Sequence, residues 1–190
     1  MSGVAKPAEP GGPNEEESVV LLDDERRPIG VAPKSGVHHG ETPLHLAFSC
    51  YVFDARGRLL VTRRALGKRT WPGVWTNSCC GHPAPGEPSE DAVRRRVRQE
   101  LGMGIGSLRP ALPDFRYRAV DASGVVENEV CPVYVAEPEG DPVPDPEEVM
   151  DWRWVDWRTF ADMAEAAPWS ISPWAAEQAV LLRDALFTNS

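Results

Sequence analysis

The feature that most constrains the fold is a pair of strand-forming segments joined by a four-residue turn. Residues 44–54 (LHLAFSCYVFD) and 58–65 (RLLVTRRA) are rich in β-branched, aromatic and other apolar residues, and residues 54–57 (DARG) form a typical turn sequence. This pattern predicts a β-hairpin. A second hairpin is predicted around residues 121–124 (DASG), which separate DFRYRAV from VVENEVCPVYVAE. Much of the chain is therefore expected to form β-sheet.

Helical segments alternate with these strands. Residues 89–102 (SEDAVRRRVRQELG) begin with Ser89 as a candidate N-cap and end with Gly102 as a candidate stop. Apolar residues recur every four positions in this segment and are expected to form its buried stripe: Val93, Val97 and Leu101. Two further helices are expected near residues 157–166 and 173–187, so the fold class is α+β.

Chain length and composition predict one structured domain. A chain of 190 residues fits a single domain with a sizeable core. Residues 1–17 are rich in Pro, Gly and Glu and are expected to form a disordered tail. Structure is expected to begin at Ser18, and residues 18–190 to form one domain with a mixed β-sheet core and flanking helices.

The net charge of −9 argues against non-specific binding to nucleic acid or to an anionic membrane. No apolar run approaches the roughly 20 residues needed to span a bilayer, and the N-terminus has no apolar signal core. We therefore expect a cytoplasmic protein with free thiols, and a monomer, since nothing in the sequence suggests an obligate assembly.

Histidines and paired glutamates form a candidate metal-binding set. The residues concerned are His38, His39, His45, His82, Glu127 and Glu129. The two glutamates are two positions apart in a predicted strand, so both carboxylates should share one face, which is costly unless a cation or proton compensates them. Imidazole with carboxylate suits Mn, Fe, Co or Zn. The alternative is that the histidines are scattered and the glutamates lie on a solvated strand edge.

A basic cluster follows the second strand segment. The sequence TRRALGKRT contains Arg63, Arg64, Lys68 and Arg69 within seven residues. Arg64 and Lys68 could clamp a diphosphate through charge-assisted hydrogen bonds, with Lys34 as a further candidate. The alternative is a solvated basic turn.

Residues 81–102 look like a degenerate Nudix box. The spacing fits at Gly81, Glu87, Arg95 and Glu100. It departs at Arg96 and Gln99, where the box has glutamate. Because those glutamates hold the cations that drive cleavage in Nudix hydrolases, the departures argue against hydrolysis. Glu100 remains able to bind one hard cation such as Mg²⁺.

The chain also resembles the type I isopentenyl-diphosphate isomerases, a Nudix-like family. The segments that carry the resemblance are LHLAFS, LLVTRRAL, WPGVWTNS, CGHP, EDAVRRR, PDFRYRA, VENEVCPV, EVMDWRW and PWSISPW, which together extend over roughly residues 18–187. The resemblance implies a Nudix-like fold and the interconversion of isopentenyl and dimethylallyl diphosphate. A Nudix hydrolase and a non-catalytic metal- or diphosphate-binding module are the alternatives.

The resemblance also implies roles for particular residues. One divalent metal, Mn²⁺ or Zn²⁺, is held by His38, His45, His82, Glu127 and Glu129, while Glu100 contributes to a substrate-associated Mg²⁺. The catalytic pair is Cys80 and Glu129, assisted by Tyr117. The diphosphate is bound by Lys34, Arg64, Lys68 and Arg96, and Trp174 covers the hydrocarbon end. His39 and Cys79 are expected to be bystanders, and core packing is the alternative role for Tyr117 and Trp174.

Overall fold

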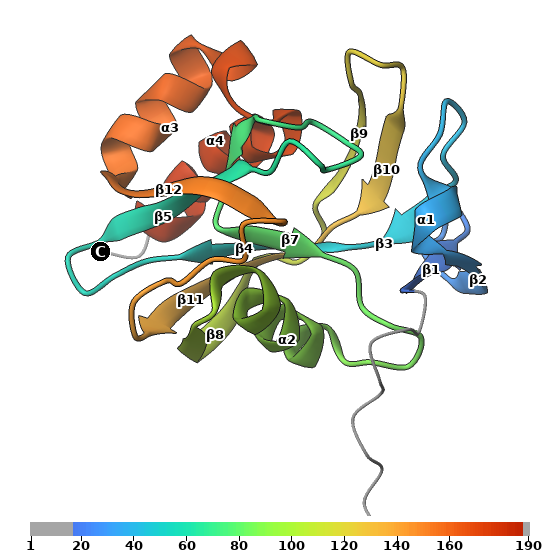
Figure 1. Cartoon of the computed structure of the whole chain (residues 1–190), viewed down its shortest axis with the longest axis horizontal. Coiled ribbons are helices and arrows are strands. Elements are labelled where there is room, and N and C mark those ends of the chain that lie inside the picture. Colours follow the sequence, from blue (N-terminus) through green and yellow to red (C-terminus); the bar gives the residue numbers. More distant parts are fainter. Residues whose placement is uncertain (1–16, 188–190) are drawn as a thin grey trace, which may run out of the picture.

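Three β-sheets and their covering helices make up residues 17–187, the part of the chain that the computed structural model describes (Figure 1). A five-stranded sheet has the order β2 (Pro28–Pro33), β1 (Ser18–Leu22), β3 (His45–Leu46), β10 (Val126–Val130), β9 (Arg116–Val120). A four-stranded sheet has the order β7 (Cys79–Gly81), β4 (Phe48–Val52), β11 (Val133–Glu139), β8 (Gly104–Leu112). A three-stranded sheet has the order β12 (Val149–Asp156), β5 (Arg58–Arg64), β6 (Trp75–Thr76).

Helices cover these sheets. They are α1 (Lys34–Val37), α2 (Ser89–Leu101), α3 (Trp157–Ala166), a 3₁₀ turn at Pro168–Ser170, and α4 (Pro173–Phe187). Strand β3 pairs in parallel with β10, and β4 in parallel with β11, whereas the other strand pairs are antiparallel. Mixed sheets with flanking helices confirm the predicted α+β class.

Two apolar cores lie on opposite sides of β4 and β5. Helix α2 contributes its predicted stripe, with Val93, Val97 and Leu101 fully buried, to the core that also contains Phe48 and Leu60. Helices α3 and α4 pack into the other core. That core contains Tyr51, Leu59, Val61, Phe160 and Leu182. Alternate residues of the same strands thus enter different cores, as the period of two requires.

The first predicted hairpin is wrong, although its turn forms. The chain reverses at residues 54–57, where Gly57 has a φ of 73° and its N–H donates to the carbonyl of Asp54. Beyond the turn only Phe53 and Leu59 form an isolated bridge. Strand β4 then pairs with β7 and β11, and β5 pairs with β12 and β6. Each of β4 and β5 pairs with a strand on both edges and is therefore an inner strand of its own sheet. Both strands are also buried on both faces.

The second hairpin is confirmed, since β9 and β10 pair in antiparallel register around the turn at residues 121–124. The predicted start of β1 at Ser18 and the two C-terminal helices are also confirmed. At α2 the stop at Gly102 is confirmed by a left-handed φ of 62°, but the N-cap is Pro88 rather than Ser89. Ser89 lies one position inside the helix, so its side chain does not cap it.

Residues 1–16, most of the predicted tail, lie outside the described part of the chain. Glu17 is described and precedes β1 directly. Within residues 17–187, no helix is both long enough and apolar enough to cross a lipid bilayer.

Candidate metal and diphosphate site

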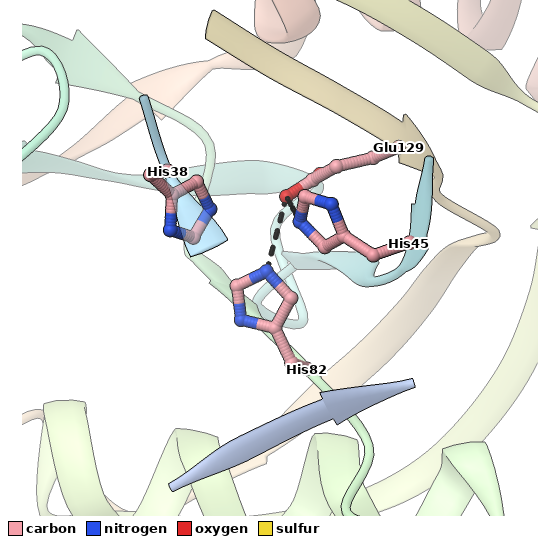
Figure 2. A group of neighbouring side chains, drawn as sticks. All are labelled: His38, His45, His82 and Glu129. Carbon is pink, nitrogen blue, oxygen red and sulfur yellow. Dashed lines mark hydrogen bonds and ion pairs between the residues drawn. The ribbon is translucent and has the colours of Figure 1, made fainter. Parts of the chain in front are cut away.

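Three of the four histidines converge on one glutamate (Figure 2). His38 follows α1, His45 lies on β3, His82 follows β7, and Glu129 lies on β10. One side-chain ligand atom from each lies within 4.8 Å of the others. Glu129 Oε1 is 3.1 Å from His82 Nε2 and 3.4 Å from His45 Nε2. Four segments that are distant in sequence therefore meet in one polar cluster.

Strand register explains this convergence. Glu129 on β10 is the register partner of His45 on the parallel strand β3. Glu127, two residues earlier on the same face, has its Oε2 3.0 Å from His38 Nε2. His45 Nδ1 lies 2.9 Å from the carbonyl of Pro43, to which it donates when protonated at that nitrogen. This hydrogen bond leaves Nε2 of His45 as a free lone pair directed at the cluster.

The donor set fits a divalent metal. Four side-chain atoms in the cluster are buried and have no hydrogen-bond partner within the described part of the chain. They are Nε2 of His38, Nε2 of His45, Nδ1 of His82 and Oε2 of Glu127. Buried polar atoms normally have a hydrogen-bonding partner. Several such atoms without one at the same place therefore indicate that a further group, such as a metal ion, binds there. Imidazoles with carboxylates are ligands that suit Mn²⁺ or Zn²⁺. His39 does not join the cluster, because its Nδ1 accepts from the backbone N–H of Glu41.

The charge states of the cluster suit metal binding. Burial lowers the pKa of His82 to about 4, so this imidazole is neutral at pH 7. Burial would raise the pKa of Glu129, but its contacts with His45 and His82 hold it well below its usual range. Burial likewise opposes protonation of His45, yet its contact with Glu129 raises the His45 pKa. A neutral imidazole and an ionised carboxylate are the forms that bind metals.

A basic cluster faces this centre across a common cavity. Arg96 and Glu100 form an ion pair one helical turn apart on α2. Lys68 Nζ lies 3.5 Å from Glu100 Oε1. Burial would raise the pKa of Glu100, but Arg96 and Lys68 lower it, so Glu100 is ionised. Arg64 donates through its Nε (3.0 Å) and Nη2 (2.9 Å) to the carbonyl oxygen of Thr70.

Two glutamates that sequence analysis did not single out bind the same cations. Glu17 pairs with Lys34, and its Oε1 lies 3.1 Å from Nη1 of Arg96. Glu148 pairs with Lys68, and its Oε1 lies 3.5 Å from Nη2 of Arg96. These carboxylates offset the positive charge of the basic cluster. No local pattern marks them, since each is one of several acidic residues in its stretch of the sequence.

A thiol and an indole lie between the two clusters. Cys80 Sγ is 3.2 Å from Asn77 Oδ1 and 3.4 Å from Ser49 Oγ. Burial raises the pKa of Cys80 to about 11, so the group is a thiol at neutral pH. Trp174 on α4 is 3% exposed, and the Arg64 guanidinium carbon lies 5.5 Å from the centre of its ring.

Tyr117 and Cys79 contact the same region. Tyr117 on β9 is the register partner of Glu129, and its ring centre lies 5.8 Å from that of Trp174. Burial raises the pKa of Tyr117, so its hydroxyl remains protonated. Cys79, expected to be a bystander, has its Sγ 3.4 Å from Glu100 Oε2.

One cavity of about 370 Å³ brings the candidate residues together. All of the predicted site residues except His45 line it: Lys34, His38, Arg64, Lys68, Cys80, His82, Arg96, Glu100, Tyr117, Glu127, Glu129 and Trp174. His45 lies behind Glu129 and contacts it. The cavity is also lined by Glu17, Ser35, Arg69, Thr70 and Gly81. It has an acidic and histidine-rich side, a basic side, and aromatic and thiol groups between them.

Comparison with known protein families matches residues 43–175 to the NUDIX domain. Solved structures of the same architecture include a protein of Deinococcus radiodurans, with a TM-score of 0.66 at 18% identity over 89% of this chain and 99% of that one. A MutT protein of Methanosarcina mazei gives a TM-score of 0.56 at 18% identity over 79% and 98% of the two chains. The chain therefore belongs to the class of proteins with a NUDIX fold, as predicted.

Curated relatives narrow this class. An isopentenyl-diphosphate Delta-isomerase of Frankia alni is 66% identical over 163 residues, which cover 86% of this chain and 84% of the relative. One of Mycolicibacterium vanbaalenii is 65% identical over 166 residues, covering 87% and 91%. The chain belongs to the isopentenyl-diphosphate Delta-isomerase family.

Proposed function

We propose that this protein interconverts isopentenyl diphosphate and dimethylallyl diphosphate. The supporting observation is the single cavity in which Cys80 and Glu129 share one space with the cluster of Lys34, Arg64, Lys68 and Arg96. Moving a double bond along a five-carbon chain requires one proton to be added and another to be removed two carbons away. A thiol and a carboxylate beside an anion-binding cluster can perform both transfers on one bound molecule.

The basic cluster binds the diphosphate. Arg64, Lys68 and Arg96 carry charged donors suited to phosphate oxygens, and Lys34 lies at the same end of the cavity. A bound diphosphate displaces the carboxylate of Glu17 from Lys34 and Arg96. Glu100, which is buried and ionised, is the residue that holds a substrate-associated Mg²⁺ at this end. Binding energy gathered here positions the hydrocarbon end of the substrate.

Glu129 and Cys80 exchange protons with the hydrocarbon end. In the direction towards dimethylallyl diphosphate, we assign protonated Glu129, assisted by the hydroxyl of Tyr117, as the donor and the Cys80 thiolate as the acceptor. The pKa shifts of the two groups favour a carboxylate at Glu129 and a thiol at Cys80, and this is the pair of states that follows these transfers. The same state begins the reverse reaction with the two roles exchanged.

The intermediate of this reaction resembles a tertiary carbocation. The buried indole of Trp174 offers it a π-face, worth on the order of 2 kcal/mol when desolvated. Burial also excludes water, which would capture the cation. The metal held by His38, His45, His82, Glu127 and Glu129, which we assign as Mn²⁺ or Zn²⁺, orients Glu129 and tunes its proton affinity when bound.

The test is direct conversion in D₂O. Protein reconstituted with Mn²⁺ or Zn²⁺ and with Mg²⁺ is expected to convert isopentenyl diphosphate to the dimethylallyl isomer with deuterium incorporation, detected by NMR. Cys80→Ala is expected to lose nearly all turnover, whereas Cys50→Ala, a buried thiol of the other core, is expected to retain it. Phosphate release without isomerisation would indicate a hydrolase. Metal binding with neither reaction would indicate a non-catalytic module. A cytoplasmic location and a monomeric state remain predictions.

A further inference from the structure

The side-chain amide of Asn77 is fully buried between β6 and β7. Its Nδ2 donates to two backbone carbonyls, those of Cys50 and Cys79, at 3.0 Å each. These two carbonyls belong to neighbouring strands, since Cys50 on β4 is the register partner of Cys79 on β7. Because both amide hydrogens are used in this way, the orientation of the amide is fixed and Oδ1 must point away from the two strands.

The oxygen of this amide faces the candidate active site. Trp174 Nε1 donates to Asn77 Oδ1 at 3.0 Å, and Cys80 Sγ lies 3.2 Å from the same atom. The hydroxyl of Thr76 also donates to Oδ1 at 2.9 Å, and Ser172 Oγ lies 2.7 Å from that hydroxyl. The indole N–H, the thiol S–H and the Thr76 hydroxyl therefore all converge on Oδ1.

We infer that Asn77 is a positioning residue that fixes the distance between the thiol of Cys80 and the indole of Trp174. This inference depends on the proposed roles of those two groups. Cys80 lies on β7 and Trp174 on α4, and these two residues are 94 positions apart in the chain. Asn77 Oδ1 is hydrogen-bonded to both of them. Since Nδ2 anchors Asn77 to β4 and β7, the thiol and the indole are held relative to the sheet as well as to each other.

A proton acceptor and a cation-stabilising ring must act on the same five-carbon chain, so their separation matters. A displacement of about 1 Å in a reacting group can lower the rate on the order of 100-fold. In the proposed function the diphosphate is bound by Lys34, Arg64, Lys68 and Arg96, and within the described residues the Asn77 side chain is hydrogen-bonded to none of them. Loss of the Asn77 oxygen is therefore expected to affect the chemical step and leave substrate binding nearly unchanged.

Steady-state kinetics of the metal-reconstituted enzyme test this division. Asn77→Ala is expected to lower kcat on the order of 100-fold and to change KM by less than about threefold. Ser78→Ala is the matched control. Ser78 is the next residue and is equally buried, but its hydroxyl bonds to the backbone of Val52 and Leu60 on the opposite side. This control should lose stability while keeping kcat within about threefold of the parent.

A spectroscopic measurement tests the geometry without catalysis. In a ¹H–¹⁵N NMR spectrum, the indole resonance that disappears in Trp174→Phe identifies the Nε1–H of Trp174. It is expected to move upfield in Asn77→Ala, because its hydrogen bond is lost, and to stay in place in Ser78→Ala. If Asn77→Ala does not fold, Asn77→Ser serves instead, because its hydroxyl is too short to reach both groups and the same shift and loss of kcat are expected.

The outcomes separate the inference from the proposed function. An indole resonance that does not move, or a kcat that stays within about threefold of the parent in a folded Asn77 variant, overturns the role of Asn77. So does an equal loss of kcat in Ser78→Ala. If Cys80→Ala keeps its turnover, the proposed catalytic role of Cys80 is wrong, whatever the Asn77 variants do. If the metal-reconstituted parent converts no isopentenyl diphosphate, the proposed function itself is wrong.

Discussion

Glu129 combines two tasks in the proposed site, since it contributes to the metal cluster and exchanges protons with the substrate. Its replacement therefore removes both functions and cannot separate them. The histidines are better probes of the metal, because they do not face the reacting carbons in the proposed mechanism. His82 is the most informative of them, since its Nε2 contacts Glu129 at 3.1 Å and its side chain is 12% exposed.

Loss of a residue that only hydrogen-bonds to a metal ligand lowers metal affinity by about 10- to 100-fold. His82→Ala removes a ligand itself and is therefore expected to lower the affinity for Mn²⁺ or Zn²⁺ by more than about 100-fold. Metal content after dialysis, measured by mass spectrometry of the ions, checks this. The matched control is His39→Ala, the neighbour of His38 that points out of the cluster and bonds to Glu41. Equal metal content in the parent and in His82→Ala would contradict the assigned ligand set.

Arg64 and Arg63 offer a similar pair at the diphosphate end. Arg64 lines the cavity, whereas Arg63 donates to the carbonyl of Gly73 at 2.8 Å and does not line it. Arg64→Ala is expected to raise KM about 10- to 100-fold, the cost of one or two charge-assisted hydrogen bonds, with a smaller loss in kcat. Arg63→Ala should leave KM nearly unchanged in the same initial-rate assay. Similar KM values for both variants would place the diphosphate elsewhere.

Helix α2 keeps some residues of the Nudix box and differs from the box at others. Glu87 and Arg95 keep the ion pair of the box, with Arg95 Nη2 and Glu87 Oε2 2.8 Å apart. Arg96 occupies a position where the box has a carboxylate and pairs instead with Glu100. In the proposed function, a helix face that holds several cations in the box would instead bind the diphosphate and a single cation. This change favours diphosphate binding over diphosphate cleavage.

The end of α2 gives a test of the fold. Gly102 has a left-handed φ of 62°, and a Cβ at this position would lie 2.3 Å from the carbonyl oxygen of Val143. Gly102→Ala is therefore expected to lower the free energy of unfolding by about 2 to 3 kcal/mol, combining backbone strain with a clash. Chemical denaturation measures this. Gly67→Ala, which meets no atom within 4 Å, should change it by less than about 0.5 kcal/mol.

Elements with strong local signals were predictable from sequence. Helix α2 has a buried stripe and a glycine stop, and the β9–β10 hairpin has a glycine turn, and both are confirmed. The separation of β4 and β5 into different sheets was not predictable, because strand pairing depends on partners far along the chain, such as β11 and β12. The same limit applies to Asn77 and Glu148. Their importance comes from contacts with residues distant in sequence, and no local pattern reveals such contacts.

For the whole molecule, the cavity lies where separate sheets and helices meet. Its metal cluster depends on β3 and β10 of one sheet and on the residue after β7 of another, while its basic side depends on α2, β5 and the loop at residues 65–70. The chain carries a net charge of −9, yet five lysine and arginine side chains line this cavity, and three of them pair with Glu17, Glu100 or Glu148. The site is therefore a property of the assembled fold, and its electrostatics should be coupled to global stability.

That coupling predicts a pH dependence for the metal-free protein. Burial gives His82 a pKa of about 4 in the folded state, compared with 6.5 for an exposed histidine. Between pH 6.5 and 4.5 the unfolded chain binds a proton at this position and the folded chain does not. The free energy of unfolding is therefore expected to fall by about 2 kcal/mol as the pH decreases across this range. The raised pKa of His45 changes the free energy of unfolding above pH 6.5, and the lowered pKa of Glu129 changes it below pH 4.5. Neither group therefore contributes to the change between these two pH values.

Urea denaturation of chelated protein at pH 6.5, 5.5 and 4.5 measures the slope. His82→Asn should remove most of it, because asparagine does not titrate, and His39→Asn should leave it unchanged, because His39 lies outside the buried cluster. A slope that is the same in the parent and in His82→Asn would show that other groups control acid stability. Saturating Mn²⁺ or Zn²⁺ should raise the free energy of unfolding of the parent at pH 6.5. This gain should shrink as the pH decreases, since protons compete with the metal for the imidazoles.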